Sequence, residues 1–168
     1  MPSEEKKLQF LTSLLAVKKV TMADLARQMG VSPQNVQNYF RRDDMKLSYA
    51  LKFAEALGFD LKFSFERDGK TSETVRLDVQ SILNSLNGTV ALSRLSFLTI
   101  AMKLYGIERK DLAEKLGIAY VGVNKWFKVD DIAISYLFEI AELYGLKVCI
   151  KADRILSEVE KTTTLVLA

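Results

Sequence analysis

The residues best suited to chemistry form a polar stripe between positions 33 and 42. The stripe consists of Gln34, Gln37, Asn38 and Arg41. Their spacing of i, i+3, i+4 and i+7 places them on one face of an α-helix, and Asn35 and Arg42 flank that face. Amide side chains suit paired hydrogen bonds to adenine, and arginine suits guanine or phosphate. A merely solvated face is the alternative, but Lys and Glu form helices better there, so the composition favours a nucleic-acid contact.

A second set of residues lies 87 positions further along the chain, and its chemistry differs. The corresponding positions hold Val121, Asn124, Lys125 and Lys128, and Gly122 stands in place of Asn35. Valine makes no hydrogen bond, and glycine in a helix costs about 1 kcal/mol relative to alanine. The lysines, together with Arg109 and Lys110, can hold phosphates, which gives affinity without sequence information. We therefore expect the first set to read bases and the second to contact the DNA backbone or a protein partner.

The chain lacks the residues that most catalytic and metal sites need. It has no histidine, which removes the commonest general base and nitrogen ligand. Its single cysteine, Cys149, allows no intrachain disulfide and no ordinary zinc site, and its apolar neighbours predict a buried structural thiol. There is no glycine-rich phosphate loop and no nucleophile beside a base. We expect no enzymatic activity, no metal and no cofactor.

Two aspartate pairs, at 43–44 and 130–131, follow the two sets of residues. They have no base partner and no ligand cluster that would make them catalytic. We interpret them as a turn and an N-cap for the helix from Leu47 onward. If they faced phosphates, they would weaken DNA binding.

Composition and charge are those of an ordinary globular protein. The chain is 49% hydrophobic and 27% charged, which is enough apolar material for a core. The net charge of +3 is mildly basic and does not by itself indicate a nucleic-acid partner. No apolar run approaches the roughly 18 residues of a membrane span, and the first residues do not resemble a signal peptide. The expected location is therefore cytoplasmic, without a membrane partner.

The sequence repeats itself without a gap at an offset of 87 residues. Identical pairs include Asp24-Leu25-Ala26 with Asp111-Leu112-Ala113, Gly30 with Gly117, Val36 with Val123, Ser48-Tyr49 with Ser135-Tyr136, and Gly58 with Gly145. Such a period indicates two copies of one structural unit.

Each copy is expected to contain four helices. The first covers 3–17 with Ser3 as N-cap, and the second begins after a Thr21–Asp24 capping box and stops at Gly30. Ser32 and Pro33 start the third, which carries Val36 and Phe40 on its core side. The fourth covers 47–57 and ends at Gly58.

Alternating apolar residues predict strands after the helices. A hairpin of strands 61–65 and 74–79 is expected around the Asp68-Gly69 turn, with counterparts at 146–151 and 162–167, and a short helix at 80–87. Strands 61–65 and 148–150 can also build an interface by edge pairing. The expected division is a first module with hairpin at 1–79, a connector at 80–92, and a second module with C-terminal strands at 93–168.

The spacing Ala26, Gly30 and Val36 has a physical reason. A small residue lets the second helix cross the first closely, glycine allows the positive φ of the turn, and a branched residue anchors the second helix. The outer face of the second helix is then free to enter a major groove. Trp126, which aligns with Tyr39, is expected to be core or partly buried rather than a base-stacking residue.

Residues 22–40 resemble the helix-turn-helix of the Cro/repressor-type (Xre) family. Residues 53–59 are similar to the family's next helix, and residues 140–146 repeat that segment. The resemblance implies a mainly α fold with short β-hairpins, built as a tandem repeat of a four-helix lambda-repressor-like module followed by strands. It also implies that Gln34, Asn35, Gln37 and Asn38, at the start of the second helix, read bases. The second copy departs from the family's pattern, since Tyr120 replaces Pro33 and Val121 replaces Gln34.

These observations predict a sequence-specific binder of double-stranded DNA. The family contains bacterial and phage transcription regulators, many of them dimeric, so a regulator that forms a homodimer fits the resemblance. The alternative is a protein-interaction or antitoxin-like module of helix-turn-helix ancestry, whose partner would bind module 2 or a strand edge. Steep salt dependence would distinguish DNA binding from this alternative.

Overall fold

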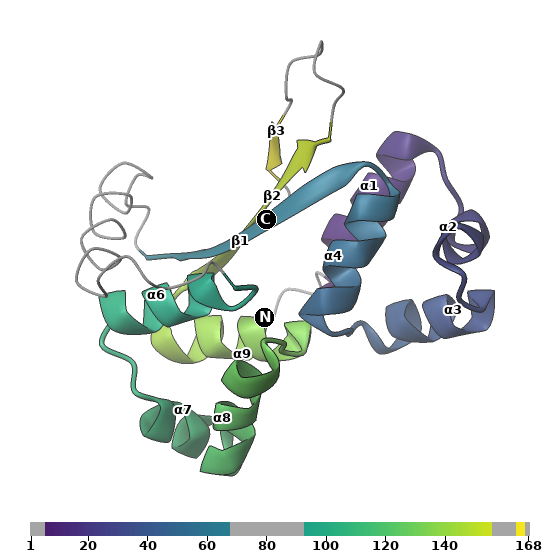
Figure 1. Ribbon diagram of the computed structural model, residues 1–168. Helices are drawn as coiled ribbons and strands as arrows, with labels where there is room; N and C mark the ends of the chain where they lie inside the picture. The colour runs from purple at the N-terminus through teal and green to yellow at the C-terminus, as the bar shows by residue number, and fades with distance from the viewer. Residues whose placement is uncertain (1–5, 68–92, 156–163, 167–168) are drawn as a thin grey trace. The chain divides into compact units, whose positions relative to one another are not determined.

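The computed structural model describes residues 6–67, 93–155 and 164–166 (Figure 1). Within these ranges the chain is mainly helical, with eight helices and a small antiparallel sheet. None of these helices is long and apolar enough to cross a membrane. The expected strand 74–79, the Asp68-Gly69 turn, the helix 80–87 and Ser3 lie outside the described residues.

The chain divides into two compact units. Unit 1 comprises residues 1–63, 133–135 and 149–168, and unit 2 comprises residues 64–132 and 136–148. The expected module boundaries fall in or beside 68–92, which is outside the described residues, so they stay predictions.

Four helices precede the sheet in unit 1, and a second set of four begins in unit 2. The first set is α1 (Gln9–Lys18), α2 (Met22–Met29), α3 (Pro33–Arg42) and α4 (Leu47–Ala56). The second set is α6 (Ser96–Leu104), α7 (Arg109–Leu116), α8 (Tyr120–Val129) and α9 (Ile134–Tyr144), whose first two residues belong to unit 1. The starts at 9, 22, 33 and 47 recur at 96, 109, 120 and 134, which is the offset of 87 found in the sequence.

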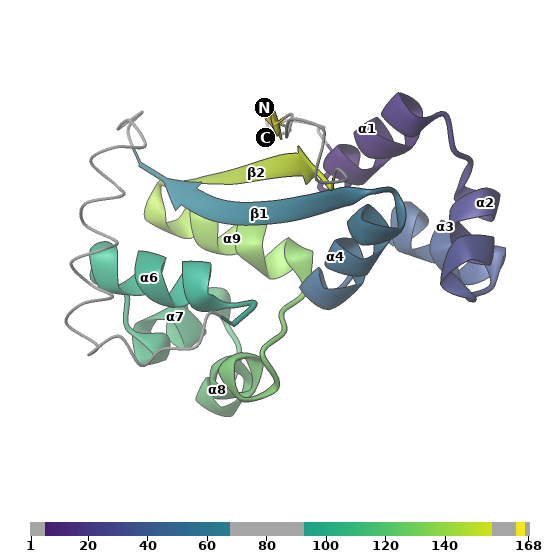
Figure 2. The ribbon, with the colours of Figure 1, turned by 45° about the horizontal axis from the view of Figure 1, so that its top comes forward.

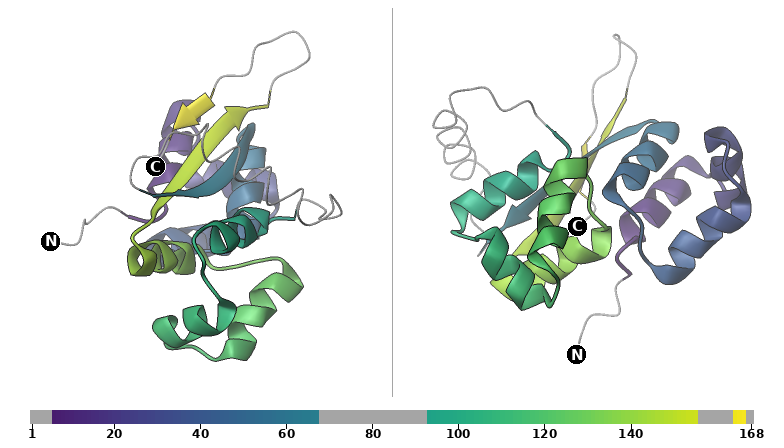
Figure 3. Two further views of the ribbon diagram at one scale, coloured as in Figure 1. Left: turned by 90° about the vertical axis from the view of Figure 1, so that its left-hand side faces the viewer. Right: turned by 60° about the horizontal axis from the view of Figure 1, so that its bottom comes forward.

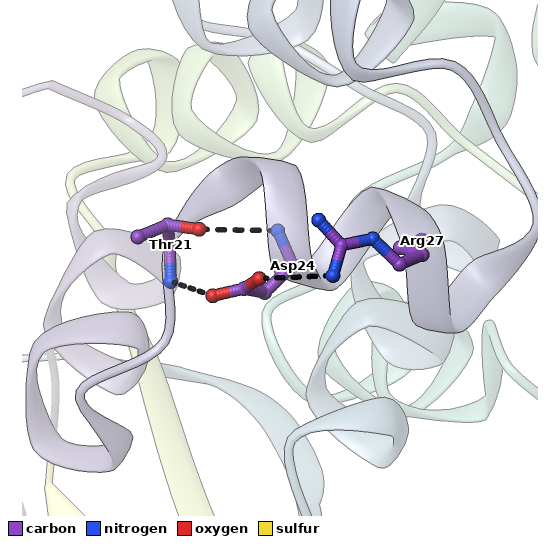
Figure 4. Close-up of polar contacts among 3 residues, drawn as sticks. All are labelled: Thr21, Asp24 and Arg27. Carbon is purple, nitrogen blue, oxygen red and sulfur yellow. Dashed lines mark hydrogen bonds and ion pairs between the residues drawn. The ribbon is translucent and has the colours of Figure 1, made fainter.

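The caps around α2 and α3 form as expected. The Thr21 hydroxyl accepts from the N–H of Asp24, and the Asp24 carboxylate accepts from the N–H of Thr21 (Figure 4). Hydrogen bonding of the Asp24 carboxylate to the side chain of Thr21, and then to its backbone N–H, holds the pKa of Asp24 below its ordinary value. Gly30 ends α2 at φ +69°, and the Ser32 hydroxyl caps α3 by accepting from the N–H of Asn35 at 3.2 Å. A tight turn therefore joins the two helices.

One aspartate in each unit ends a helix and accepts hydrogen bonds from the backbone that precedes another helix. Asp43 closes α3 in the left-handed conformation at φ +53°, and its carboxylate accepts from the N–H groups of Lys7 (2.7 Å) and Leu8 (3.0 Å), just before α1. In unit 2, Asp130 (φ +56°) ends α8 and accepts from the N–H groups of Arg94 (2.9 Å) and Leu95 (3.0 Å), before α6.

Two predictions about these segments are wrong. The helix expected from Ser3 begins instead at Gln9, where the distant carboxylate of Asp43 satisfies the backbone donors that precede it. The aspartates do not cap α4, whose N-cap is Lys46 without a side-chain hydrogen bond. Within unit 1, Asp44 instead accepts from the N–H (2.9 Å) and the hydroxyl (2.7 Å) of Ser135, in the first turn of α9.

Val36 is buried as expected, whereas Phe40 is only half-buried. In unit 1, Ala26 and Val36 are fully inaccessible and pack with Phe53 and Leu25 between α2, α3 and α4. Unit 2 buries the equivalent side chains, Leu112, Ala113, Val123 and Ile140. Trp126 is 9% exposed, and its ring lies 5.0 Å from that of Tyr136, which confirms its expected burial.

The sheet has the strand order β1-β2-β3, and Figure 2 shows β1 beside β2. Its strands are β1 (Phe59–Glu66), β2 (Lys147–Arg154) and β3 (Thr164–Val166). β2 and β3 are antiparallel, with Ala152 opposite Leu165, which confirms the hairpin expected there. The strands expected at 61–65 and 148–150 were predicted to form an interface through their edges. They lie in β1 and β2, which are neighbours in the sheet of one chain. Beside them, the Gly58 carbonyl accepts from the N–H of Ile155 at 2.8 Å. Cys149 on β2 is buried, as expected.

The hydrogen bonds of the Asp130 carboxylate predict that the stability of the protein depends on pH. Burial alone would raise the pKa of Asp130, but the N–H groups of Arg94 and Leu95 lower it below its ordinary value. A carboxyl with a depressed folded pKa stabilises the fold above its unfolded pKa, and this contribution is lost as pH falls through the folded value. We expect Asp130→Asn to reduce the free energy of unfolding by about 1 kcal/mol at neutral pH.

Urea titrations between about pH 5 and pH 3 measure the pH-dependent part. Asp130→Asn should lose less stability over this range than the wild type. Asp60→Asn, at an exposed position of β1, is the matched control and should follow the wild type. Parallel pH profiles for the wild type and Asp130→Asn would contradict the capping role.

Candidate nucleic-acid interface

The outer face of α3 carries the amides and arginine expected from the sequence. Val36 is fully buried and anchors the helix, and Phe40 is half-buried. Gln34, Gln37 and Arg41 are exposed and Asn38 is half-buried. No acidic residue occurs in α3. The structure therefore places the predicted stripe where a ligand can reach it, on a helix held from behind by a buried valine.

Two contacts connect side chains in the second half of α3. Arg41 donates from Nη2 to Oδ1 of Asn38 at 2.8 Å, and the Arg42 guanidinium lies 5.6 Å from the Tyr39 ring centre. These residues and Asn35 line a hollow of about 300 Å³. Because an amide oxygen has two lone pairs and Arg41 has further N–H groups, the pair can still bind an outside donor or acceptor. The arginines are thereby held close to the amides they would assist.

Sequence reasoning missed the residues next to this hollow. Arg42 and Tyr39 also line a second hollow of about 440 Å³ in unit 1, together with Lys46 and Tyr49. The rings of Tyr39 and Tyr49 lie 5.3 Å apart. Burial is the main cause that raises the pKa of Tyr39, and a hydrogen bond from the Tyr39 hydroxyl to Tyr49 adds to it. For Lys46, the available sequence signal was a lysine directly before the expected start of a helix at residue 47. No spacing in the sequence indicated that Tyr49 reaches Tyr39.

In unit 2 the structure brings two of the predicted residues together. α7 and α8, teal to green in Figure 3, follow each other through the turn at Gly117. Arg109, the first residue of α7, lies 4.0 Å from the centre of the Phe127 ring and donates to Oδ1 of Asn124 at 3.1 Å. The guanidinium is thus fixed over α8 while its remaining N–H groups can bind a phosphate.

The other predicted residues of unit 2 are exposed cations, namely Lys110, Lys125 and Lys128. Two apolar side chains stand among them at the start of α8: Tyr120 is 52% exposed and Val121 is 62% exposed. Lys110, Arg109 and Tyr120 line a hollow of about 520 Å³. α8 therefore differs from α3, because it combines positive charge with apolar surface.

Three of the four aspartates in the two pairs accept strong hydrogen bonds from other parts of the chain. The carboxylate oxygens of Asp43 and Asp130 each accept backbone N–H groups, and both oxygens of Asp44 bind Ser135. These hydrogen bonds offset part of each negative charge within the fold. In the part of the chain that the structure describes, no group of three or more acidic, cysteine or histidine residues could hold a metal ion.

Comparison with known proteins finds no match to this chain among family models, curated proteins or solved structures. The resemblance to the Cro/repressor-type family therefore remains a prediction from residues 22–40 and their counterparts.

The contacts of Arg109 predict that its removal destabilises the protein more than removal of the neighbouring Lys110. Arg109→Ala removes the contact with Phe127 and the hydrogen bond to Asn124, and we expect a loss of about 1 kcal/mol in the free energy of unfolding. Lys110→Ala, which removes the same charge from the next residue, should change it by less than about 0.5 kcal/mol. Urea denaturation measures both variants. Equal losses would contradict a fixed position for Arg109.

Proposed function

We propose that this chain is a bacterial or phage protein that binds DNA sequence-specifically and acts as a transcriptional regulator in the bacterial cytoplasm. Each set of four helices acts as a helix-turn-helix module of the Cro/repressor type. α3 reads bases in the major groove, and α7 and α8 contribute cations to the DNA backbone. The chain needs no cofactor for this activity.

The observation that carries the proposal is the exposed face of α3. Its amides stand one helical turn apart on a helix without acidic residues, and arginines follow at its C-terminal end. The side chains that pair best with adenine and guanine edges are amides and arginine. A buried Val36 on the opposite side and a capped start at Ser32 give this face a rigid support.

Unit 2 supports the backbone part of the proposal. Arg109 is held over Phe127, and Lys110 on α7 and Lys125 and Lys128 on α8 are exposed. Lysine and arginine contacts to phosphate supply affinity that does not depend on base sequence. The two modules thus differ in chemistry, although their helices begin at equivalent positions.

One observation favours a second candidate function, a protein-interaction or antitoxin-like role. Tyr120, Val121 and Val129 on α8 are each at least half exposed. Exposed apolar residues on one helix are typical of a protein interface. A protein partner on this face would bind without the steep salt dependence of phosphate contacts.

Selection from a random duplex library tests the proposal. We expect the wild type to enrich one motif and Gln34→Ala/Gln37→Ala to lose it, since each paired base contact contributes about 1–3 kcal/mol of discrimination. Lys125→Ala/Lys128→Ala should keep the motif and bind more weakly to all sequences. Its slope of log affinity against log salt should fall by about 0.9 for each phosphate that the variant no longer neutralises.

Two single variants serve as matched controls. Gln28→Ala removes an exposed amide from α2, and Lys147→Ala removes an exposed cation from β2, and both should behave as the wild type. A wild type that binds no duplex in a salt-sensitive way would contradict the proposed function and leave the protein-partner role.

A further inference from the structure

The start of α8 presents an unusual combination of side chains. Val121 is 62% exposed, although a valine gains most from burial. Lys125 and Lys128 follow it at i+4 and i+7 on the same helix face, and both are exposed. The surface around Val121 is therefore apolar at its centre and cationic along the helix.

The next residue is Gly122, and the fold does not require a glycine at this position. It lies inside α8 with ordinary helical φ, and a Cβ added to it would meet no atom within 4 Å. Glycine at such a position costs a helix about 1 kcal/mol relative to alanine. A glycine that the fold does not require is typical of a place where a ligand approaches the backbone closely.

Few partners match this combination. A membrane would need a wider apolar face than one short turn of helix provides. The DNA major groove fits, because it exposes the C5-methyl group of thymine between two rows of phosphates. Val121 would meet the methyl group while Lys125 and Lys128 reach the phosphates, so charge complementarity favours DNA as the occupant of this face.

We infer that the first turn of α8 reads thymine: the Val121 methyl groups contact the C5-methyl group of a thymine, and Gly122 allows the helix to approach that base. This inference rests on the proposed function and extends it, since it assigns base readout to both modules. α3 then recognises hydrogen-bonding edges, whereas α8 recognises an apolar group. The target is consequently an asymmetric site with a thymine in the part that α8 contacts.

Replacing thymine by deoxyuridine tests the inference, because this change removes only the methyl group. The probe is the duplex selected by the wild type, made with deoxyuridine at each thymine position in turn. We expect about a fourfold loss of affinity at one or two positions, the value for one buried methyl group. Val121→Ala should bind the thymine and deoxyuridine forms equally at those positions. Gln34→Ala, the matched control on α3, should keep the fourfold difference.

The outcomes separate this inference from the proposed function. If the wild type binds the selected duplex but no deoxyuridine position weakens binding, the inference is overturned and DNA binding stands. If Val121→Ala keeps the full fourfold difference, another residue reads the methyl group and the inference is also overturned. If the wild type binds no duplex, the proposed function itself fails, and the apolar turn belongs to a protein partner.

Gly122→Ala gives a second test, in which both the melting temperature and the affinity for DNA are measured. Because the added Cβ points into open space, we expect the melting temperature to rise by about 2–4 °C. The same variant should bind the selected duplex about tenfold more weakly, since the added methyl group would crowd the contact between the helix and the base. A more stable variant with unchanged affinity would contradict close approach at Gly122.

Discussion

An aspartate at the end of α3 and its counterpart at the end of α8 fix the geometry on which the candidate interface depends. Asp43 terminates α3 in the left-handed conformation and, with the same side chain, satisfies two backbone donors before α1. Asp130 does the same for α8 and α6. A short polar side chain is among the few that tolerate this backbone conformation. The exposed face of α3 is therefore held at its C-terminal end by a capping bond and in its middle by Val36.

Local structure was predictable from the sequence, because short-range rules govern it. The Thr21–Asp24 box, the Ser32 cap, the stop at Gly30 and the burial of Val36 all follow from neighbouring residues. The offset of 87 residues also anticipated the equivalent helix starts.

Long-range partners were not predictable in the same way. Nothing near Ser3 or Leu8 indicates that a carboxylate 35 residues away caps the chain before α1. The bonds between Asp44 and Ser135 span 91 residues, and the pairing of β1 with β2 likewise depends on folding of the whole unit. At the candidate site, the stripe on α3 was predicted in full, whereas the placement of Arg109 over Phe127 required the packing of α7 on α8.

The two sets of four helices share their buried positions and differ at their exposed positions. The core positions are kept, with Ala26, Val36 and Phe53 matched by Ala113, Val123 and Ile140. The exposed positions differ, because hydrogen-bonding amides on α3 correspond to an apolar turn and lysines on α8. Burial constrains the inner residues, and the outer residues are free to adapt to a ligand. In this account the whole chain recognises an asymmetric site rather than two identical halves.

The ratio of affinities for the selected duplex and for a scrambled duplex of the same composition tests the central claim most directly. Fluorescence anisotropy at one fixed salt concentration measures both values. A sequence-specific protein is expected to prefer its own site by about 10³-fold or more. A ratio near one would show that the exposed amides of α3 do not read bases, and it would contradict the account.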